Sequence, residues 1–130
     1  MMIMAACLLA TTAAFGADKP NTDRDALLGT WTVAQGIYAD GSLEKELEME
    51  FTFKKDTMTN PMEDGELAYV LNEKEKTVSA KAAKSSIWIR YRIVDGSTMQ
   101  FTEMRVTTEK GVTAIIGDKG TFKSMDLKRK

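Results

Sequence analysis

The sequence predicts an all-β protein, an eight-stranded antiparallel up-and-down meander that closes into a β-barrel. Apolar and polar residues alternate in short segments along the chain after residue 27, as in strands that bury one face. Eight such segments fit into about 100 residues, and short turns containing Gly, Asp or Asn separate them. Closure into a barrel is the simplest arrangement because it removes the exposed sheet edges. An open or sandwich-like sheet is the alternative.

The first predicted strand, residues 28–38, ends at a turn that contains Asp40 and Gly41, a pair suited to positive backbone φ angles. The second, residues 46–54, has the strictest alternation of apolar and polar residues: Leu47, Met49, Phe51 and Phe53 against Glu46, Glu48, Glu50, Thr52 and Lys54. We expect its glutamates to form an exposed row rather than the paired carboxylates of a glycosidase.

The other strands are expected at residues 66–71, 77–82, 86–94, 99–108, 112–116 and 121–128. Residues 60–65 form the longest irregular connection, because Pro61 and Gly65 disfavour a central strand there. In residues 86–94, Trp88, Arg90 and Arg92 share one face of the strand. These arginines either line a pocket for an anionic group or form a solvated strand face, which is the commoner arrangement.

The N-terminal residues 1–17 carry no charge, whereas all 18 Lys and Arg and all 19 Asp and Glu follow them. This uncharged run, ending in small residues, is typical of a secretory signal peptide and is too short to span a bilayer. A flexible leader at residues 18–26, in which Asp23 or Asp25 would cap a helical turn, then precedes the barrel domain, residues 27–130. We therefore expect export to the periplasm or outside the cell, without lipidation at Cys7.

The composition excludes much enzyme chemistry. The chain has no His, and its single Cys, Cys7, lies in the expected signal peptide, which excludes Ser or Cys triads, His or Cys metal sites and disulfides in the mature domain. A formal net charge of −1 argues against nucleic-acid binding. No later apolar segment is long enough to cross a membrane. We expect a non-enzymatic protein without catalytic residues, metal or cofactor.

Residues 27–33, which include Gly29 and Trp31, resemble the G-x-W motif that opens the first barrel strand of lipocalins and of lipocalin-like domains in small secreted bacterial proteins. Residues 91–99 resemble a later hairpin of those bacterial domains. The resemblance implies that Trp31 closes the barrel base, where a basic side chain from the end of the chain, Arg129 or Lys128, stacks on its ring.

The candidate ligand-binding residues are Tyr69, Tyr91, Glu103 and Arg105. Glu103 and Arg105 share a strand face with Met99 and Phe101, so this acid and this base enter the barrel if those apolar residues point inward. The opposite register places Gln100, Thr102, Met104 and Val106 inside and leaves both charges in water. The pattern does not choose between these two registers.

Two functions fit these observations. The first is an exported lipocalin-like protein that binds a small apolar or amphipathic molecule in the barrel mouth, with an arginine fixing any anionic end. The second is a structural or protein-interaction module of the cell envelope whose barrel is filled by its own side chains. The partner is a small hydrophobic ligand in the first case and an envelope protein in the second.

Overall fold

A computed structural model describes residues 22–45 and 47–130. The expected signal peptide, residues 18–21 of the expected leader, and Glu46 lie outside the described residues. The described elements are α1 (Asp23–Leu27), β1 (Gly29–Ile37), β2 (Leu43–Glu44), β3 (Glu50–Phe53), β4 (Thr57–Asn60), β5 (Glu63–Asn72), β6 (Thr77–Lys81), β7 (Ser85–Ile93), β8 (Thr98–Thr108), β9 (Gly111–Ile116) and β10 (Ser124–Arg129).

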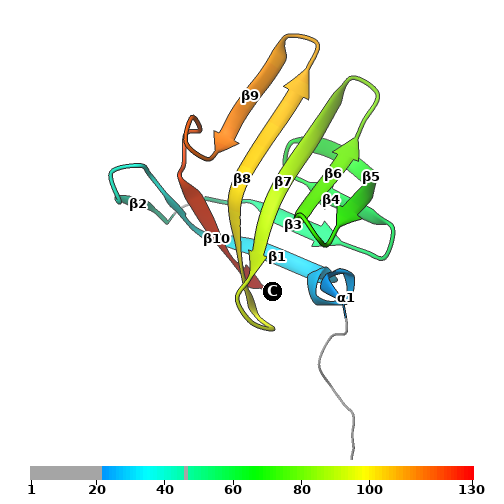
Figure 1. Cartoon of the computed structure of the whole chain (residues 1–130), viewed down its shortest axis with the longest axis horizontal. Helices are drawn as coiled ribbons and strands as arrows, with labels where there is room; N and C mark the ends of the chain where they lie inside the picture. Colours follow the sequence, from blue (N-terminus) through cyan, green and yellow to red (C-terminus); the bar gives the residue numbers. More distant parts are fainter. Residues whose placement is uncertain (1–21, 46) are drawn as a thin grey trace, which may run out of the picture.

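The strands form a closed antiparallel barrel, which confirms the predicted fold class (Figure 1). Neighbours in the barrel follow the chain from β1 through β3, β4, β5, β6 and β7 to β8. Strand β10 then pairs with β1 along one edge and with β8 along the other, which closes the ring at eight strands. The remaining strands, β2 and β9, extend single edges of this barrel.

One of the eight barrel positions differs from the prediction, because β4 belongs to the ring and β9, which was expected there, does not. Strand β4 was not predicted, because the prediction assigned Asn60 and Pro61 to an irregular connection and the strand ends at Asn60. Strand β9 was predicted, but it pairs only with Met104–Thr108, the half of β8 that runs beyond the barrel closure. The other half of the same β8 edge pairs with β10. Strands β9 and β10 are therefore two halves of one interrupted partner strand.

Neither predicted register holds along the whole of β8, because the strand contains a β-bulge. Arg90 of β7 pairs with Glu103, but the next residue, Tyr91, pairs with Phe101, so Thr102 is an extra residue. Phe101 and Met104 consequently both point inward and are fully buried. Glu103 and Arg105 stay on the outer face, and the expectation that they enter the barrel under the inward register of Phe101 is wrong.

The barrel interior is packed with large apolar side chains. The ring centroids of Phe51 and Phe101 lie 5.0 Å apart in an edge-to-face contact across it. The largest fully buried side chains are Trp31, Phe51, Phe53, Phe101, Leu27, Met58, Ile89, Met99, Met104, Ile116, Met125 and Leu127. Four methionines belong to this set, in keeping with the ability of that flexible side chain to fill irregular gaps.

Helix α1 covers one end of the barrel, which we call the closed end (Figure 1). The Thr22 hydroxyl caps the helix by accepting a hydrogen bond from the Asp25 backbone N–H, so neither Asp23 nor Asp25 is the cap. The Leu27 side chain is fully buried against the barrel. From residue 22 onward the expected flexible leader is thus a helix seated on the barrel. The turns after β4, β6 and β8 lie at the opposite end, which we call the far end.

Candidate functional site

The closed end is built around Trp31 and Arg129. Trp31 is fully buried, and its indole N–H donates a hydrogen bond of 2.9 Å to the Leu27 carbonyl at the end of α1. The guanidinium carbon of Arg129 lies 4.3 Å from the centroid of the Trp31 ring. Arg129, and not the exposed Lys128, therefore provides the stacking cation at this ring.

The same guanidinium bonds to three backbone carbonyls. Nε donates to Gly96 at 2.8 Å, Nη2 donates to Ala26 at 2.7 Å, and Nη1 donates to Leu28. Gly29 allows this approach, because its φ angle is +119° and an added Cβ would lie 2.7 Å from Nη1. The motif residues Gly29, Trp31 and Arg129 thus form one joint between β1, β10 and α1.

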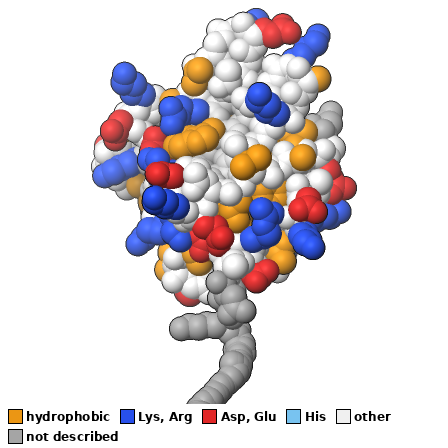
Figure 2. All heavy atoms as spheres, turned by 45° about the vertical axis from the view of Figure 1, so that its right-hand side comes forward, with side chains coloured by type: hydrophobic (Ala, Val, Ile, Leu, Met, Phe, Trp, Pro, Cys, Tyr) orange, Lys and Arg blue, Asp and Glu red, His pale blue; other side chains and the backbone are white. Residues whose placement is uncertain are grey.

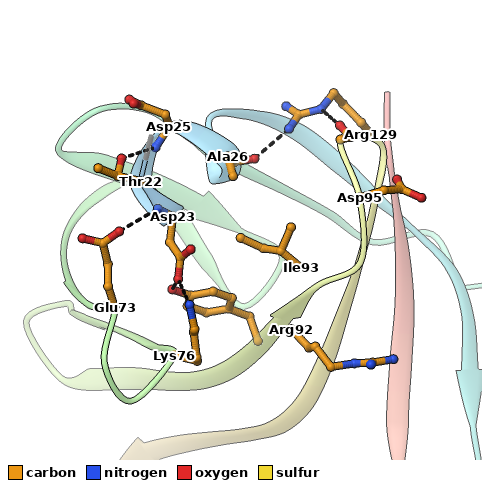
Figure 3. A pocket seen from close by; sticks show the side chains of 12 residues that line it. Thr22, Asp23, Asp25, Ala26, Glu73, Lys76, Arg92, Ile93, Asp95 and Arg129 are labelled. Carbon is orange, nitrogen blue, oxygen red and sulfur yellow. Dashed lines mark hydrogen bonds and ion pairs between the residues drawn. The ribbon is translucent and has the colours of Figure 1, made fainter. Parts of the chain in front are cut away.

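A hollow of about 650 Å³ lies beside this joint, between α1, the β5–β6 turn and the β7–β8 turn (Figure 3). The side chains of Ile93 and Ala26 supply apolar surface. The Tyr91 hydroxyl donates to Asp23 Oδ2 at 2.6 Å, and Lys76 Nζ donates to the same oxygen at 2.6 Å. Because Tyr91 is only 2% exposed, its ring belongs to the barrel core and its hydroxyl alone faces the helix.

Charge and burial set the protonation states of this network. Partial burial raises the pKa of Asp23, but the hydrogen bonds from Lys76 and Tyr91 and the Lys76 charge outweigh it and leave that pKa below its ordinary value. Burial and the neighbouring Asp23 carboxylate raise the pKa of Tyr91 far above its ordinary value. Asp23 is therefore an ionised acceptor and Tyr91 a neutral donor at neutral pH. Both are occupied in fastening α1 to the barrel.

Tyr69 also lies beneath α1. Its hydroxyl donates to the Lys54 carbonyl at 2.6 Å, and its ring packs edge-on against Phe53, with centroids 5.7 Å apart. The guanidinium carbon of Arg24 lies 5.3 Å from the centroid of the Tyr69 ring. Burial raises the pKa of the Tyr69 phenol, so that it remains a donor. The two candidate tyrosines thus support the helix from inside the barrel and do not line an open cavity together.

Glu103 and Arg105 meet on the outer surface, away from both tyrosines. Glu103 Oε1 lies 2.5 Å from Arg90 Nη1, and Glu103 Oε2 lies 3.9 Å from Arg105 Nη2. The Arg105 guanidinium carbon is 4.1 Å from the centroid of the Trp88 ring. Both residues also line a second hollow, of about 640 Å³, outside β8. The four candidate residues therefore occupy two separate places, the closed end and the outer face of β8.

The sequence interpretation missed Asn60, the only polar side chain that is buried among the described residues, at 6% exposure. It lies at the far end and points to the same side of β4 as the core residue Met58. Oδ1 accepts a hydrogen bond of 2.9 Å from the Met62 backbone N–H, which fixes the orientation of the amide. Nδ2 has no hydrogen-bond partner within the described part of the chain. The alternation of Met58 and Asn60 before Pro61 is the weak sequence signal that could have identified it.

The far end also keeps several apolar side chains partly exposed. Leu67 and Val106 pair with the inward-facing residues Met58 and Ile87 and are themselves only half-buried. Tyr38 stacks on Phe122 with ring centroids 4.8 Å apart, and Leu47 and Met62 pack at the same end. The far end therefore combines apolar surface with one unpaired buried amide, whereas the closed end is covered by α1.

Within residues 22–45 and 47–130, no group of three or more His, Cys, Asp or Glu is placed to hold a metal ion. The helical part of this region is too short and too polar to cross a membrane. No protein-family model, no curated protein and no solved structure matches the chain.

Proposed function

We propose that the chain is an exported, non-enzymatic barrel of the lipocalin-like type that binds a small apolar or amphipathic molecule at its far end. The observation that carries this proposal is the buried Asn60 amide, whose Nδ2 lacks a partner among the described residues. A buried N–H without an acceptor costs about 1–3 kcal/mol. An acceptor atom on a ligand that displaces the side chains covering Nδ2 recovers that free energy, and this gives a reason for a polar residue at an otherwise apolar position.

The surroundings of Asn60 suit the apolar part of such a ligand. Met62 and Leu67 are half-buried beside β4, so a ligand that covers them removes more apolar area from water, at about 25 cal/mol per Å². Methionine side chains such as Met62 adapt their shape to an incoming group at little cost. Export is proposed from the uncharged residues 1–17, and the lipocalin-like relationship from the Gly29, Trp31 and Arg129 joint.

The test compares Asn60→Leu with Asn72→Leu, which makes the same substitution in an exposed residue at the closed end. We expect an environment-sensitive apolar dye to bind the unaltered protein once per chain and to be displaced by fatty acids. Asn60→Leu should weaken dye binding at least about tenfold, because the free amide donor is lost. The variant should unfold at a nearly unchanged temperature, since removal of an unpaired buried donor offsets loss of the hydrogen bond from the Met62 N–H. Asn72→Leu should bind the dye as the unaltered protein does.

Equal dye affinity in Asn60→Leu and the unaltered protein would contradict the assignment of Asn60. Absence of saturable dye binding would contradict the ligand-binding function as a whole.

The second candidate function is a filled barrel that acts as a structural or protein-interaction module of the envelope. The observation that favours it is the packed interior. Fully buried side chains occur from Leu27 at the closed end to Met104, in the half of β8 that pairs with β9. Native mass spectrometry of protein purified from its own host without detergent separates the two. A retained small molecule supports the ligand carrier, whereas a bare mass, or a fixed multiple of it, supports the filled barrel.

A further inference from the structure

The interruption between β9 and β10 creates a hollow on the outer surface of the barrel. Strand β9 leaves the β8 edge at Met104, and β10 rejoins that edge at Phe101. Residues 117–123 leave the sheet between these two points, and the β8 bulge at Thr102 faces the gap. The resulting hollow of about 640 Å³ is lined by the side of β8, by this loop and by the start of β10.

Arg105 forms one wall of this hollow and is held in place by its neighbours. Its guanidinium carbon lies 4.1 Å from the Trp88 ring centroid, so the ring orients the guanidinium. Glu103 Oε2 lies 3.9 Å from Arg105 Nη2, a long ion pair. The other oxygen, Oε1, lies closer to Arg90, at 2.5 Å from Nη1. The Arg105 side chain remains 47% exposed. The result is an oriented guanidinium that shares a single acidic partner with Arg90, so the two arginines and Glu103 together keep a net positive charge.

The other charged groups around the hollow are mostly basic. Lys119 and Lys123 line it from the loop and make no ion pair within the described part of the chain. With Arg90 included, four basic side chains face two acidic ones, a local net charge of +2 in a chain whose formal net charge is −1: Arg90, Arg105, Lys119 and Lys123 against Glu103 and Asp118. The hydroxyl groups of Thr102 and Ser124 add polar atoms to the wall. The local charge is therefore opposite in sign to that of the whole molecule.

The other hollows of the described residues differ from this one in their charges. Figure 2 shows hydrophobic side chains interleaved with charged groups of both signs across the visible face. The closed-end hollow carries four acidic and three basic side chains, and its central Asp23 and Lys76 already pair with each other: Asp23, Asp25, Glu73 and Asp95 against Lys76, Arg92 and Arg129. Among these hollows of the described residues, the one beside β8 combines an oriented guanidinium with a positive local charge and two lysines that make no ion pair.

We propose that this hollow is an anion-binding site in which Arg105 contacts a carboxylate, phosphate or sulfate group of a small molecule or polymer. The planar guanidinium offers parallel N–H donors that match two oxygens of such a group. Lys119 and Lys123 add charge from the opposite wall. Trp88 is a positioning residue that holds the guanidinium and does not touch the anion. This site lies outside the barrel and is independent of the proposed site at Asn60.

The test is a titration at low ionic strength, because salt screens charges on an exposed surface. Inorganic phosphate, inorganic sulfate and glucuronate are added separately, and the backbone amide resonances of residues 102–105 and 117–124 are followed by NMR. We expect saturable shifts confined to these segments with at least one anion. Tighter binding of glucuronate than of phosphate assigns the site to carboxylates, and the reverse order assigns it to phosphate groups.

Three variants locate the site. Arg105→Ala should weaken binding at least about tenfold, and Arg105→Lys should weaken it less, since a lysine keeps the charge but loses the paired donors. Trp88→Leu should weaken binding severalfold although it removes no charge. The matched control, Arg92→Ala, removes an exposed arginine of β7 that does not line this hollow. It should bind as the unaltered protein does.

Two results overturn the proposal. One is the absence of saturable shifts in these segments with all three anions. The other is equal weakening by Arg92→Ala and Arg105→Ala, which would show only a general effect of net charge. If Arg105→Ala does not fold, as judged by circular dichroism, Arg105→Lys and Trp88→Leu carry the test, and unchanged binding in both also overturns it.

Discussion

Asp23 makes more contacts with the barrel than Asp25, the other acidic residue of α1. Its carboxylate accepts hydrogen bonds from Tyr91 and Lys76, and its backbone N–H donates to Glu73 Oε1 at 2.6 Å. These contacts attach the short helix to β7 and to the β5–β6 turn. Because the contacts with Tyr91 and Lys76 are strongest when the Asp23 carboxylate is ionised, the attachment of α1 depends on pH.

We predict that Asp23→Asn removes part of the acid sensitivity of the fold. The pKa of Asp23 lies below its ordinary value of 3.8 in the folded protein, so protons bind the unfolded chain more tightly. Its contribution to stability is therefore present above that ordinary value and is lost as the pH falls through the folded-state pKa. The free energy of unfolding, from urea titrations at several pH values, should be lower for the variant at neutral pH. The difference from the unaltered protein should shrink towards acid pH.

Asp25→Asn is the matched control, because Asp25 lies on the same helix with an exposed side chain. It should leave the acid dependence nearly unchanged. A difference between Asp23→Asn and the unaltered protein that stays constant across the acid range would contradict the role given to the Asp23 carboxylate.

At the scale of single elements, strand β8 shows where sequence patterns predict structure and where they do not. Strict alternation in residues 86–94 correctly predicts that Ile87, Ile89 and Tyr91 share the inner face. In β8 the alternation changes phase at Thr102, and hydropathy alone does not reveal a bulge because both phases contain apolar residues. The candidate pair Glu103 and Arg105 was therefore left between two registers.

The prediction missed two other features for comparable reasons. The four-residue strand β4 is too short for a clear pattern, and the adjacent Pro61 indicated a turn. Asn60 was missed with it. The contact between Trp31 and Arg129 was anticipated from the resemblance of residues 27–33 to a short motif, which does not depend on strand register.

We predict that deletion of Thr102 leaves the barrel folded, because it removes the bulge without turning any side chain of β8 to the other face. In the shortened strand Phe101 and Met104 still alternate inward, and Glu103 stays outside, opposite Arg90. The deletion should lower the free energy of unfolding by no more than about 1–3 kcal/mol. Thr102→Ala keeps the strand length and should change it by less than about 1 kcal/mol. Chemical denaturation followed by tryptophan fluorescence measures both variants. Loss of the fold in the deletion variant alone would contradict the account of the bulge.

At the scale of the whole molecule, the sheet consists of a closed eight-stranded ring and two strands, β2 and β9, that pair on one side only. Every strand of the ring has a neighbour on each side, whereas β9 pairs with β8 alone and carries Val112 at 63% exposure. The β8–β9 hairpin projects beyond the rest of the barrel in Figure 1. Its hydrogen bonds therefore lie closer to solvent than those of the ring.

We predict that this difference appears in amide hydrogen exchange. Amides of residues 111–114 in β9 and of the two-residue strand β2 should exchange by local opening, much faster than those of β1, β7 and β10. The slowest amides of the ring should exchange only through global unfolding. Exchange measured by NMR or mass spectrometry at several urea concentrations separates the two classes. Equal protection of β9 and β7 would contradict this division.

The pairing of β1 with β10 also fixes the order of events when the chain folds. Arg129 bonds to the carbonyl of Leu28, 101 positions earlier, and this pairing completes the ring. Contacts between such distant positions slow folding, because a long loop must close before they form. While the chain is being synthesised, the edge of β1 opposite β3 has no partner until β10 has emerged. The ring therefore stays open up to that point, and the earlier strands form at most an open sheet with an unpaired edge.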